Sequence, residues 1–292
     1  MSSESPVALG GSRQDFTPPV HIYEPHRAGI PNLGPYIREL WRRREFASES
    51  SKAALRSENT LTVFGQVWMV LNPLLLAGVY YLLVSVLSGK PQGWGYFSHL
   101  TGGLFAFYFV SNSMMSGAQS IVGGGKLLLN TSFPRLLMPF AAVRTAFFRF
   151  LPTVPVYLLF HVLAGNPWNL GTLSALAFLF LLVIFSLGIA AFFATIQVYF
   201  RDATSFLPYL NRIWLYVSPV LITIDKMPKE LRSLGEINPL FSLLGGYTEA
   251  LVSGTVPSLR LWLFASGWSV AALVIGSLFF ISRERDFAVR IF

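Results

Sequence analysis

The chain has 292 residues, of which 53% are hydrophobic and only 12% are charged, and its net charge is +8. Soluble domains average about 25% charged residues, so this composition argues against a soluble enzyme or a nucleic-acid-binding domain. The positive charge is instead typical of basic segments beside anionic membrane lipids. Cysteine is absent, which excludes disulfides and thiolate metal sites.

The N-terminal region changes character near residue 33. Residues 1–32 are rich in Ser, Pro and Gly and poor in large apolar residues, so we expect a flexible cytoplasmic tail. No apolar core typical of a cleavable signal occurs before residue 67, so we expect this tail to be retained. Within residues 33–60, apolar side chains recur every three to four positions, at Leu33, Tyr36, Ile37, Leu40 and Trp41. This pattern predicts a cytoplasmic amphipathic helix that lies on the membrane surface or packs on a cytoplasmic partner.

Residues 61–292 alternate long apolar segments with short polar ones. Crossing a bilayer takes about 20 apolar residues. We expect six crossings, at residues 68–87, 96–119, 139–163, 171–199, 206–224 and 261–282. Lys and Arg are more frequent in the segments that lie on the same side as the two termini, so we expect both termini in the cytoplasm.

Residues 225–260 lie outside in this topology and contain a partly apolar stretch, residues 240–252, that is too short to cross. Asn238-Pro239 and Gly245-Gly246 bracket short helical pieces. The segment is therefore either a pair of re-entrant half-helices, with protein or water covering their backbone ends, or an ordinary folded outer loop.

The charged residues well inside the expected crossings are arginines. This disfavours a membrane enzyme or a proton-driven carrier, which need buried acids or histidines. A guanidinium group suits an anion such as a phosphate, because it donates two hydrogen bonds in a fixed fork. Arg144 lies only about 7 Å along its helix from Pro139, within reach of the inner headgroups, whereas Arg149 lies roughly 15 Å along. Arg149 and Arg212 are therefore candidates for the path of an anionic substrate, unless each merely bridges helix carbonyls.

Aromatic residues make up 15% of the chain, and most are expected to face lipid or pack. A few are expected instead to line the path of a substrate that packs on flat apolar rings. Tyr209, Arg212 and Tyr216 share one face of the fifth crossing, and Trp214 sits off that face. Only one of Tyr80 and Tyr81 can point inward from the first crossing. The candidate substrate-path residues are Arg149, Arg212, Tyr209, Tyr216, Trp214, Tyr80 and Tyr81.

The glycine run that ends at Lys126 is not a nucleotide-binding loop. Such a loop needs an earlier glycine and a Ser or Thr after the lysine, but Ser120 and Leu127 stand at these positions. Any ATPase must therefore be another chain.

Several motifs, in the right order, resemble bacterial polysaccharide-export permeases. Residues 64–74, FGQVWMVLNPL, resemble the start of their first helix, and residues 130–139, NTSFPRLLMP, resemble their inner loop between helices two and three. Arg201-Asp202, Ser218-Pro219-Val220 and Asn238-Pro239-Leu240 are similar to further landmarks. One departure is the stretch of residues 48–60 before the first crossing, which is acidic and rich in serine. The corresponding segment of these permeases is typically rich in Arg and Lys.

The resemblance implies an all-α integral membrane protein with six transmembrane helices and the type-2 ABC exporter permease fold. It also implies a homodimer with two copies of a separate ATPase subunit, on which ATP and magnesium bind, and no cofactor or metal on this chain. The substrate is then a lipid-linked polysaccharide of the O-antigen, teichoic acid or galactan type, exported across the bacterial plasma membrane. The inner loop is expected to couple to the ATPase through Lys126, Leu129, Asn130, Phe133, Pro134 and Arg135. A permease for a small lipid or drug and a non-transporting membrane assembly factor are the alternatives.

Overall fold

The computed structural model describes residues 31–57, 67–124, 133–224, 227, 235, 237–287 and 290, and within these residues the regular structure is helical. The elements in chain order are α1 (Leu33–Arg42), α2 (Arg44–Ser57), α3 (Trp68–Leu87), α4 (Trp94–Gly123), α6 (Leu137–Phe150), α7 (Thr153–Leu163), α8 (Leu170–Tyr199), α9 (Ala203–Val217), α11 (Pro239–Ser253), α12 (Leu259–Arg283) and η3 (Glu284–Asp286). The predicted all-α class is confirmed. Residues 1–30 of the expected tail lie outside the described residues.

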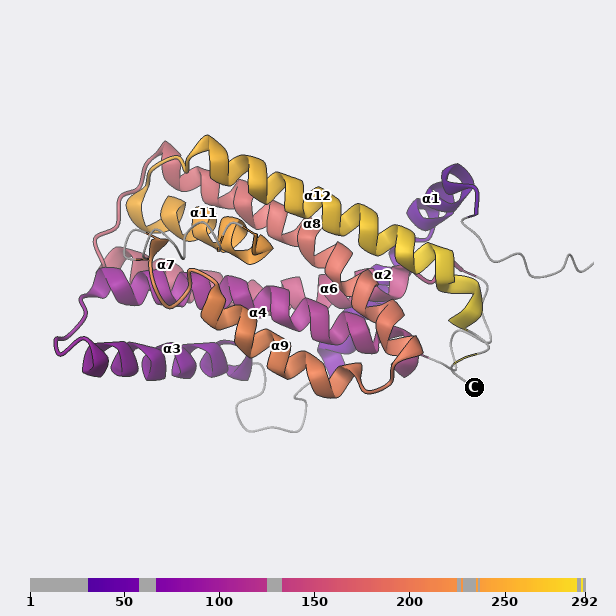
Figure 1. Cartoon of the computed structure of the whole chain (residues 1–292), viewed down its shortest axis with the longest axis horizontal. Helices are drawn as coiled ribbons and strands as arrows, with labels where there is room; N and C mark the ends of the chain where they lie inside the picture. The colour runs from indigo at the N-terminus through magenta and orange to yellow at the C-terminus, as the bar shows by residue number, and fades with distance from the viewer. Residues whose placement is uncertain are drawn as a thin grey trace, which may run out of the picture.

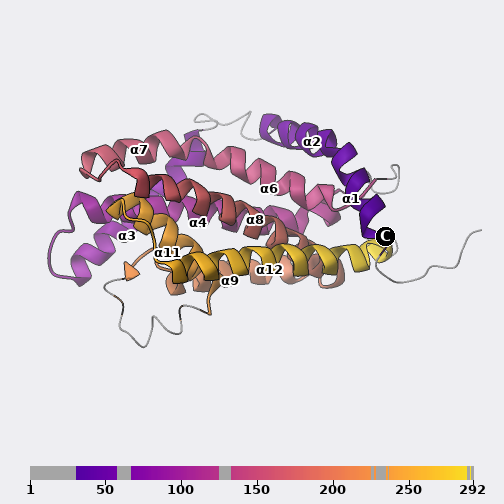
Figure 2. The ribbon, with the colours of Figure 1, turned by 90° about the horizontal axis from the view of Figure 1, so that it is seen from above.

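The long helices lie side by side in one elongated bundle (Figure 1). Helix α4 is its centre, because it packs against α3, α6, α7, α8, α9 and α11. Helix α12 packs along α8, and α11 lies against α4, α8 and α12. Seen from above, α2 lies over α6, and α1 lies near the C-terminal end of α12 (Figure 2).

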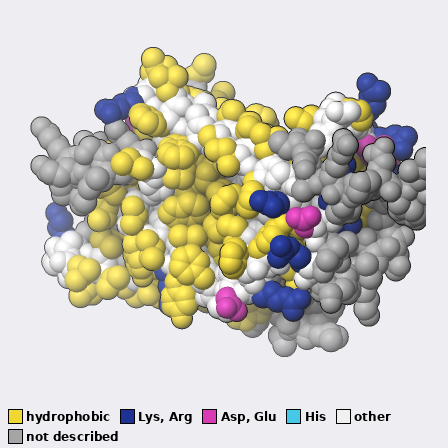
Figure 3. All heavy atoms as spheres, turned by 45° about the vertical axis from the view of Figure 1, so that its right-hand side comes forward, with side chains coloured by type: hydrophobic (Ala, Val, Ile, Leu, Met, Phe, Trp, Pro, Cys, Tyr) yellow, Lys and Arg dark blue, Asp and Glu magenta, His cyan; other side chains and the backbone are white. Residues whose placement is uncertain are grey.

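Three described helices are long and apolar enough to cross a membrane: α3, α8 and α12 extended through η3. Helices α6 and α7 pass the same test as a pair, bent by 40° at their junction. The single helix expected over residues 139–163 is therefore broken, and Pro152, which has no backbone N–H donor, lies at the break. A broad apolar face covers the bundle, and charged side chains gather toward the end that carries α1 (Figure 3).

The end of α9 and the segment between α9 and α12 differ in detail from the expected fifth crossing and outer segment. Helix α9 ends at Val217 rather than near residue 224, because Ser218 is extended and Pro219 follows. Residues 225–260 include α11, which begins with a hydrogen bond from Leu240 N–H to Asn238 Oδ1 (3.1 Å). Most of α11 is buried. Helix α11 packs against α4 and α8. Residues 225–226, 228–234 and 236, on which the expected first half-helix falls, lie outside the described residues.

Candidate functional site

Four of the candidate residues lie together on one exposed face of α3 and α9. The rings of Tyr80 and Tyr216 meet edge to face, with centroids 6.5 Å apart. The guanidinium of Arg212 lies 5.9 Å from the ring centre of Tyr209. Tyr209 and Tyr216 are 62% and 59% exposed. We call Tyr80, Tyr209, Arg212 and Tyr216 the aromatic face.

The helical repeat of α9 explains this arrangement. Leu207 and Leu215 are buried in the bundle, and Leu207 packs with Met114 and Ala118 of α4. Positions three or four residues from one another share a helix face, so the tyrosines and the arginine point away from these leucines. Trp214 is half-buried, with its ring 6.3 Å from that of Phe185. The structure therefore places Trp214 against α8 and not on the aromatic face.

Tyr81 points to different surroundings from its neighbour Tyr80. Its hydroxyl donates a hydrogen bond to the carbonyl of Gln92, after the end of α3. Its ring lies 6.3 Å from that of Tyr96 and 5.4 Å from that of Phe97. Tyr81 thus joins the packing at this end of the bundle, and Tyr80 alone of the pair belongs to the aromatic face.

Arg149 lies apart from the aromatic face, at the junction of two cavities. The larger, of about 500 Å³, lies between α3, α4 and α6–α7, and the smaller, of about 320 Å³, lies between α2, α4 and α6. Arg149 lines both, and no residue of the aromatic face lines either. The two candidate arginines are therefore in different places.

A second polar cluster ties together three segments that are far apart in the sequence. Glu284 accepts a hydrogen bond from the hydroxyl of Tyr36 (2.6 Å) and another from the backbone N–H of Arg135 (2.5 Å). The Arg135 side chain donates to the backbone carbonyl of Glu284 (2.6 Å). Burial raises the pKa of Glu284, while these hydrogen bonds act to lower it. This Glu284 cluster joins α1, the segment before α6 and the end of α12.

The sequence offered little to predict the Glu284 cluster. Tyr36 lies in the apolar stripe of the expected amphipathic helix, and Glu284 is one charge in a charged C-terminal run. A pair separated by 248 positions has no local pattern. Burial and the adjacent Glu284 carboxylate raise the pKa of Tyr36, so its hydroxyl keeps its proton as a donor.

The expected coupling segment is described in part. Lys126, Leu129 and Asn130 lie outside the described residues. Phe133 packs on Phe46 of α2 with ring centroids 4.6 Å apart, and Pro134 is buried. With Arg135 bound to Glu284, the end of this segment is held against α2 and the C-terminal end of α12.

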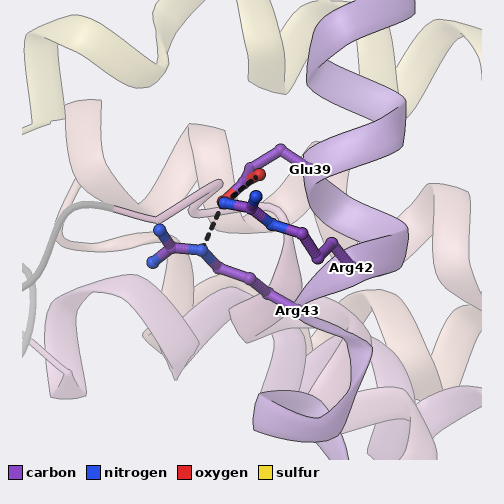
Figure 4. A network of polar contacts seen from close by, with 3 residues as sticks. All are labelled: Glu39, Arg42 and Arg43. Atoms are coloured by element: carbon purple, nitrogen blue, oxygen red, sulfur yellow. Dashed lines mark hydrogen bonds and ion pairs between the residues drawn. The ribbon is translucent and has the colours of Figure 1, made fainter.

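Two further contacts involve α1 and α2. Arg144 of α6 donates a hydrogen bond to the carbonyl of Ser48 (3.0 Å), which ties α2 to α6. In α1, Glu39 binds both Arg42 and Arg43 (Figure 4). Because these pairs lie within a few residues at the surface, they add little stability and leave α1 polar on this side. No cluster of three or more potential metal ligands occurs among the described residues.

Comparison with known proteins adds a family to this geometry. Residues 60–252 match the model of the ABC-2 type transporter family. The O-antigen export system permease protein RfbA of Klebsiella pneumoniae is 29% identical over 196 residues, which cover 67% of this chain and 75% of that protein. The protein of the same name from Myxococcus xanthus is 27% identical over 257 residues, which cover 86% of this chain and 97% of that protein.

Proposed function

The chain belongs to the ABC-2 type transporter family, and we propose that it is the permease subunit of an ATP-driven exporter of a lipid-linked polysaccharide. The similar proteins of Klebsiella pneumoniae and Myxococcus xanthus are named O-antigen export system permeases. The glycan proposed for this chain is of the O-antigen, teichoic acid or galactan type. It moves from the cytoplasmic to the outer side of the bacterial plasma membrane. The family implies an ATPase partner, and we assign ATP and magnesium to that subunit.

The aromatic face is the observation that carries the glycan assignment. Sugar rings present C–H surfaces that pack on flat aromatic rings, and such packing tolerates sliding because it does not depend on individual hydroxyl groups. Tyr209 and Tyr216 of α9 are largely exposed, so their rings are accessible at the bundle surface. Arg212 beside them supplies a positive charge for an anionic carrier group.

We propose six crossings, made by α3, α4, the bent pair α6–α7, α8, α9 and α12. Tyr36 near the start of the described chain contacts Glu284 near its end, so α1 and the end of α12 lie at one end of the bundle. This position of the two ends supports an even number of crossings. The basic residues at that end of the bundle favour the cytoplasmic side. Helix α11 belongs to the outer re-entrant segment in this arrangement.

We further propose a homodimer bearing two ATPase subunits. Six helices, with α9 only about 22 Å long, do not readily enclose a pore wide enough for a glycan. A two-fold pair that apposes the α3 and α9 edges brings two aromatic faces together. The ATPase then docks on residues 126–135, the last of which, Arg135, belongs to the Glu284 cluster.

Export by the reconstituted complex tests the glycan path. The complex of the permease and its ATPase is placed in proteoliposomes, and translocation of a lipid-linked glycan is measured. We expect Tyr209→Ala to slow export and Tyr209→Phe, which keeps the ring, to retain it. Val217→Ala is the matched control, because Val217 is an exposed aliphatic residue of α9 that is not three or four positions from Tyr209, Arg212 or Tyr216. If Tyr209→Ala exports as well as Val217→Ala, the aromatic face does not line the glycan path.

Crosslinking tests the partner. A cysteine introduced at Leu129 is expected to crosslink to the ATPase subunit from the cytoplasmic side, while labelling from outside the cell would contradict the topology. A purified permease that never associates with an ATPase favours an assembly factor. Transport of small lipids without any glycan favours a small-lipid permease.

A further inference from the structure

Two neighbouring cavities share one lining residue, Arg149, which is also the one charged residue among the described residues that line them. Trp68 and Asn72 of α3 and Tyr108 and Asn112 of α4 line the larger cavity together with Arg149 of α6. The smaller cavity runs from Arg149 along α6 to Met138, at the end of the bundle where α6 begins. We call the two together the Arg149 cavity.

The lining of this cavity suits an anion that carries an apolar chain. Among the described residues that line it, none is acidic and Arg149 is the one basic side chain. The amide groups of Asn72 and Asn112 are further hydrogen-bond donors. Aromatic rings, including Trp68 and Tyr108, supply apolar walls. An arginine with neutral hydrogen-bond donors beside aromatic rings is chemistry that suits the phosphate group of a lipid.

The cavity also lies at the depth of the inner headgroups in the proposed topology. The 20 residues of α3, Trp68–Leu87, span about 30 Å, which matches the hydrocarbon core. Trp68 and Asn72 in the first turns of α3 therefore mark the inner boundary of that core. Arg149 lines the same cavity and lies near this level, although its distance along α6 alone places it deeper.

The cavity is large enough for a headgroup and reachable from the bundle surface. Sites for small ligands typically have volumes of about 300–1,000 Å³, and both parts of the cavity fall in this range. Asn72 is exposed, and Trp68 and Arg149 are half-buried, so the α3 side is not sealed by the described residues. On the other side, Phe46 and Ser50 of α2 form a wall.

We propose that the Arg149 cavity is a reception site for the phosphate or diphosphate headgroup of a membrane lipid, separate from the aromatic face. The identity of the ligand as the lipid carrier of the glycan rests on the proposed function. A resident anionic phospholipid has the same chemistry and is the other source. In either case the headgroup enters between α3 and α6, and Arg149 binds its phosphate oxygens before the glycan reaches α9.

Photocrosslinking tests this site in the purified complex of permease and ATPase. The probe is a photoreactive polyprenyl diphosphate in vesicles of neutral lipid, and probe capture is measured at equal amounts of folded complex. We expect Arg149→Gln to reduce capture about tenfold, and Arg149→Lys to retain a part of it, since the charge stays but the fork is lost. Arg201→Gln is the matched control, because exposed Arg201 lines neither part of the cavity.

A cavity-filling variant keeps the test valid if Arg149→Gln folds poorly. Asn112→Phe leaves the arginine in place and is expected to reduce capture as well. Competition with phosphatidylglycerol identifies the source: displacement of the probe at equal concentration assigns the site to anionic phospholipids, and resistance assigns it to the diphosphate carrier. Wild-type capture by both Arg149→Gln and Asn112→Phe would overturn the site even if export proceeds. Normal capture without any glycan export would instead overturn the proposed function.

Discussion

The contact between α8 and α12 depends on two glycines that bring the helix backbones together. A Cβ atom added at Gly276 would lie 2.0 Å from the backbone oxygen of Gly188, and one added at Gly188 would lie 2.2 Å from backbone atoms of Ala272. Ala272 and Gly276 are four positions apart, the small-residue spacing that lets membrane helices approach closely. We predict that Gly276→Ala destabilises the bundle.

The size of the effect follows from these distances. Ordinary van der Waals contact begins at 3.4 Å, so a methyl group at Gly276 must displace α8 by about 1.4 Å from its position at 2.0 Å. Forcing an extra methyl group into a well-packed contact costs about 1–3 kcal/mol. Replacing a helical glycine by alanine returns roughly 0.5–1 kcal/mol of backbone entropy. Combining the two ranges gives a net loss in the free energy of unfolding of up to about 2.5 kcal/mol.

Gly267→Ala is the matched control on the same helix. No heavy atom lies within 4 Å of a Cβ atom added at Gly267, so this variant keeps the entropic gain without the clash. Thermal unfolding of the purified protein in detergent, followed by tryptophan fluorescence, is expected to rank Gly276→Ala below the wild type and Gly267→Ala at or above it. If Gly276→Ala and Gly267→Ala have the same melting temperature, the backbones of α8 and α12 are not in contact at this position.

Three further predictions concern polar groups. Burial raises the pKa of Glu284 above its ordinary value of 4.5, so the folded state holds the proton more tightly than the unfolded state. Its contribution to stability is complete below pH 4.5 and declines as the pH rises through the raised pKa. Melting temperatures measured against pH should show a weaker decline in Glu284→Gln, and identical curves would contradict this cause. Arg212→Lys retains the positive charge but loses the two-pronged hydrogen-bonding geometry of the guanidinium. It should therefore slow glycan export in proteoliposomes without lowering the amount of folded complex. Export at the wild-type rate would show that this geometry is not needed on the glycan path. The Asn166 side chain donates to the buried Ser98 hydroxyl (2.8 Å), so Asn166→Ala should lower the free energy of unfolding by about 1–3 kcal/mol, whereas an unchanged midpoint in chemical unfolding would show that the hydroxyl finds another donor.

The positions of the long apolar helices could be predicted from the sequence with small errors. The first expected crossing, residues 68–87, coincides with α3, and the last, residues 261–282, differs from α12 by three residues in all. Such segments are set by local composition, since about 20 consecutive apolar residues form one helix in a bilayer whatever packs beside them. The division of residues 139–163 into α6 and α7 was not predicted, although Pro152 was visible, because a proline can kink a helix or be accommodated within it.

The grouping of the candidate residues was decided only by the tertiary structure. Spacing along α9 placed Tyr209, Arg212 and Tyr216 on one face, because the helical repeat is a local property. The rotation of α3 against α9 determined that Tyr80 and not Tyr81 joins them. The packing of α6 against α2, α3 and α4 placed Arg149 in a separate cavity, and the Tyr36–Glu284 hydrogen bond closed across 248 positions. Residue patterns determine where each side chain points from its own helix. Which other helix it meets depends on long-range packing, which no short stretch of sequence determines.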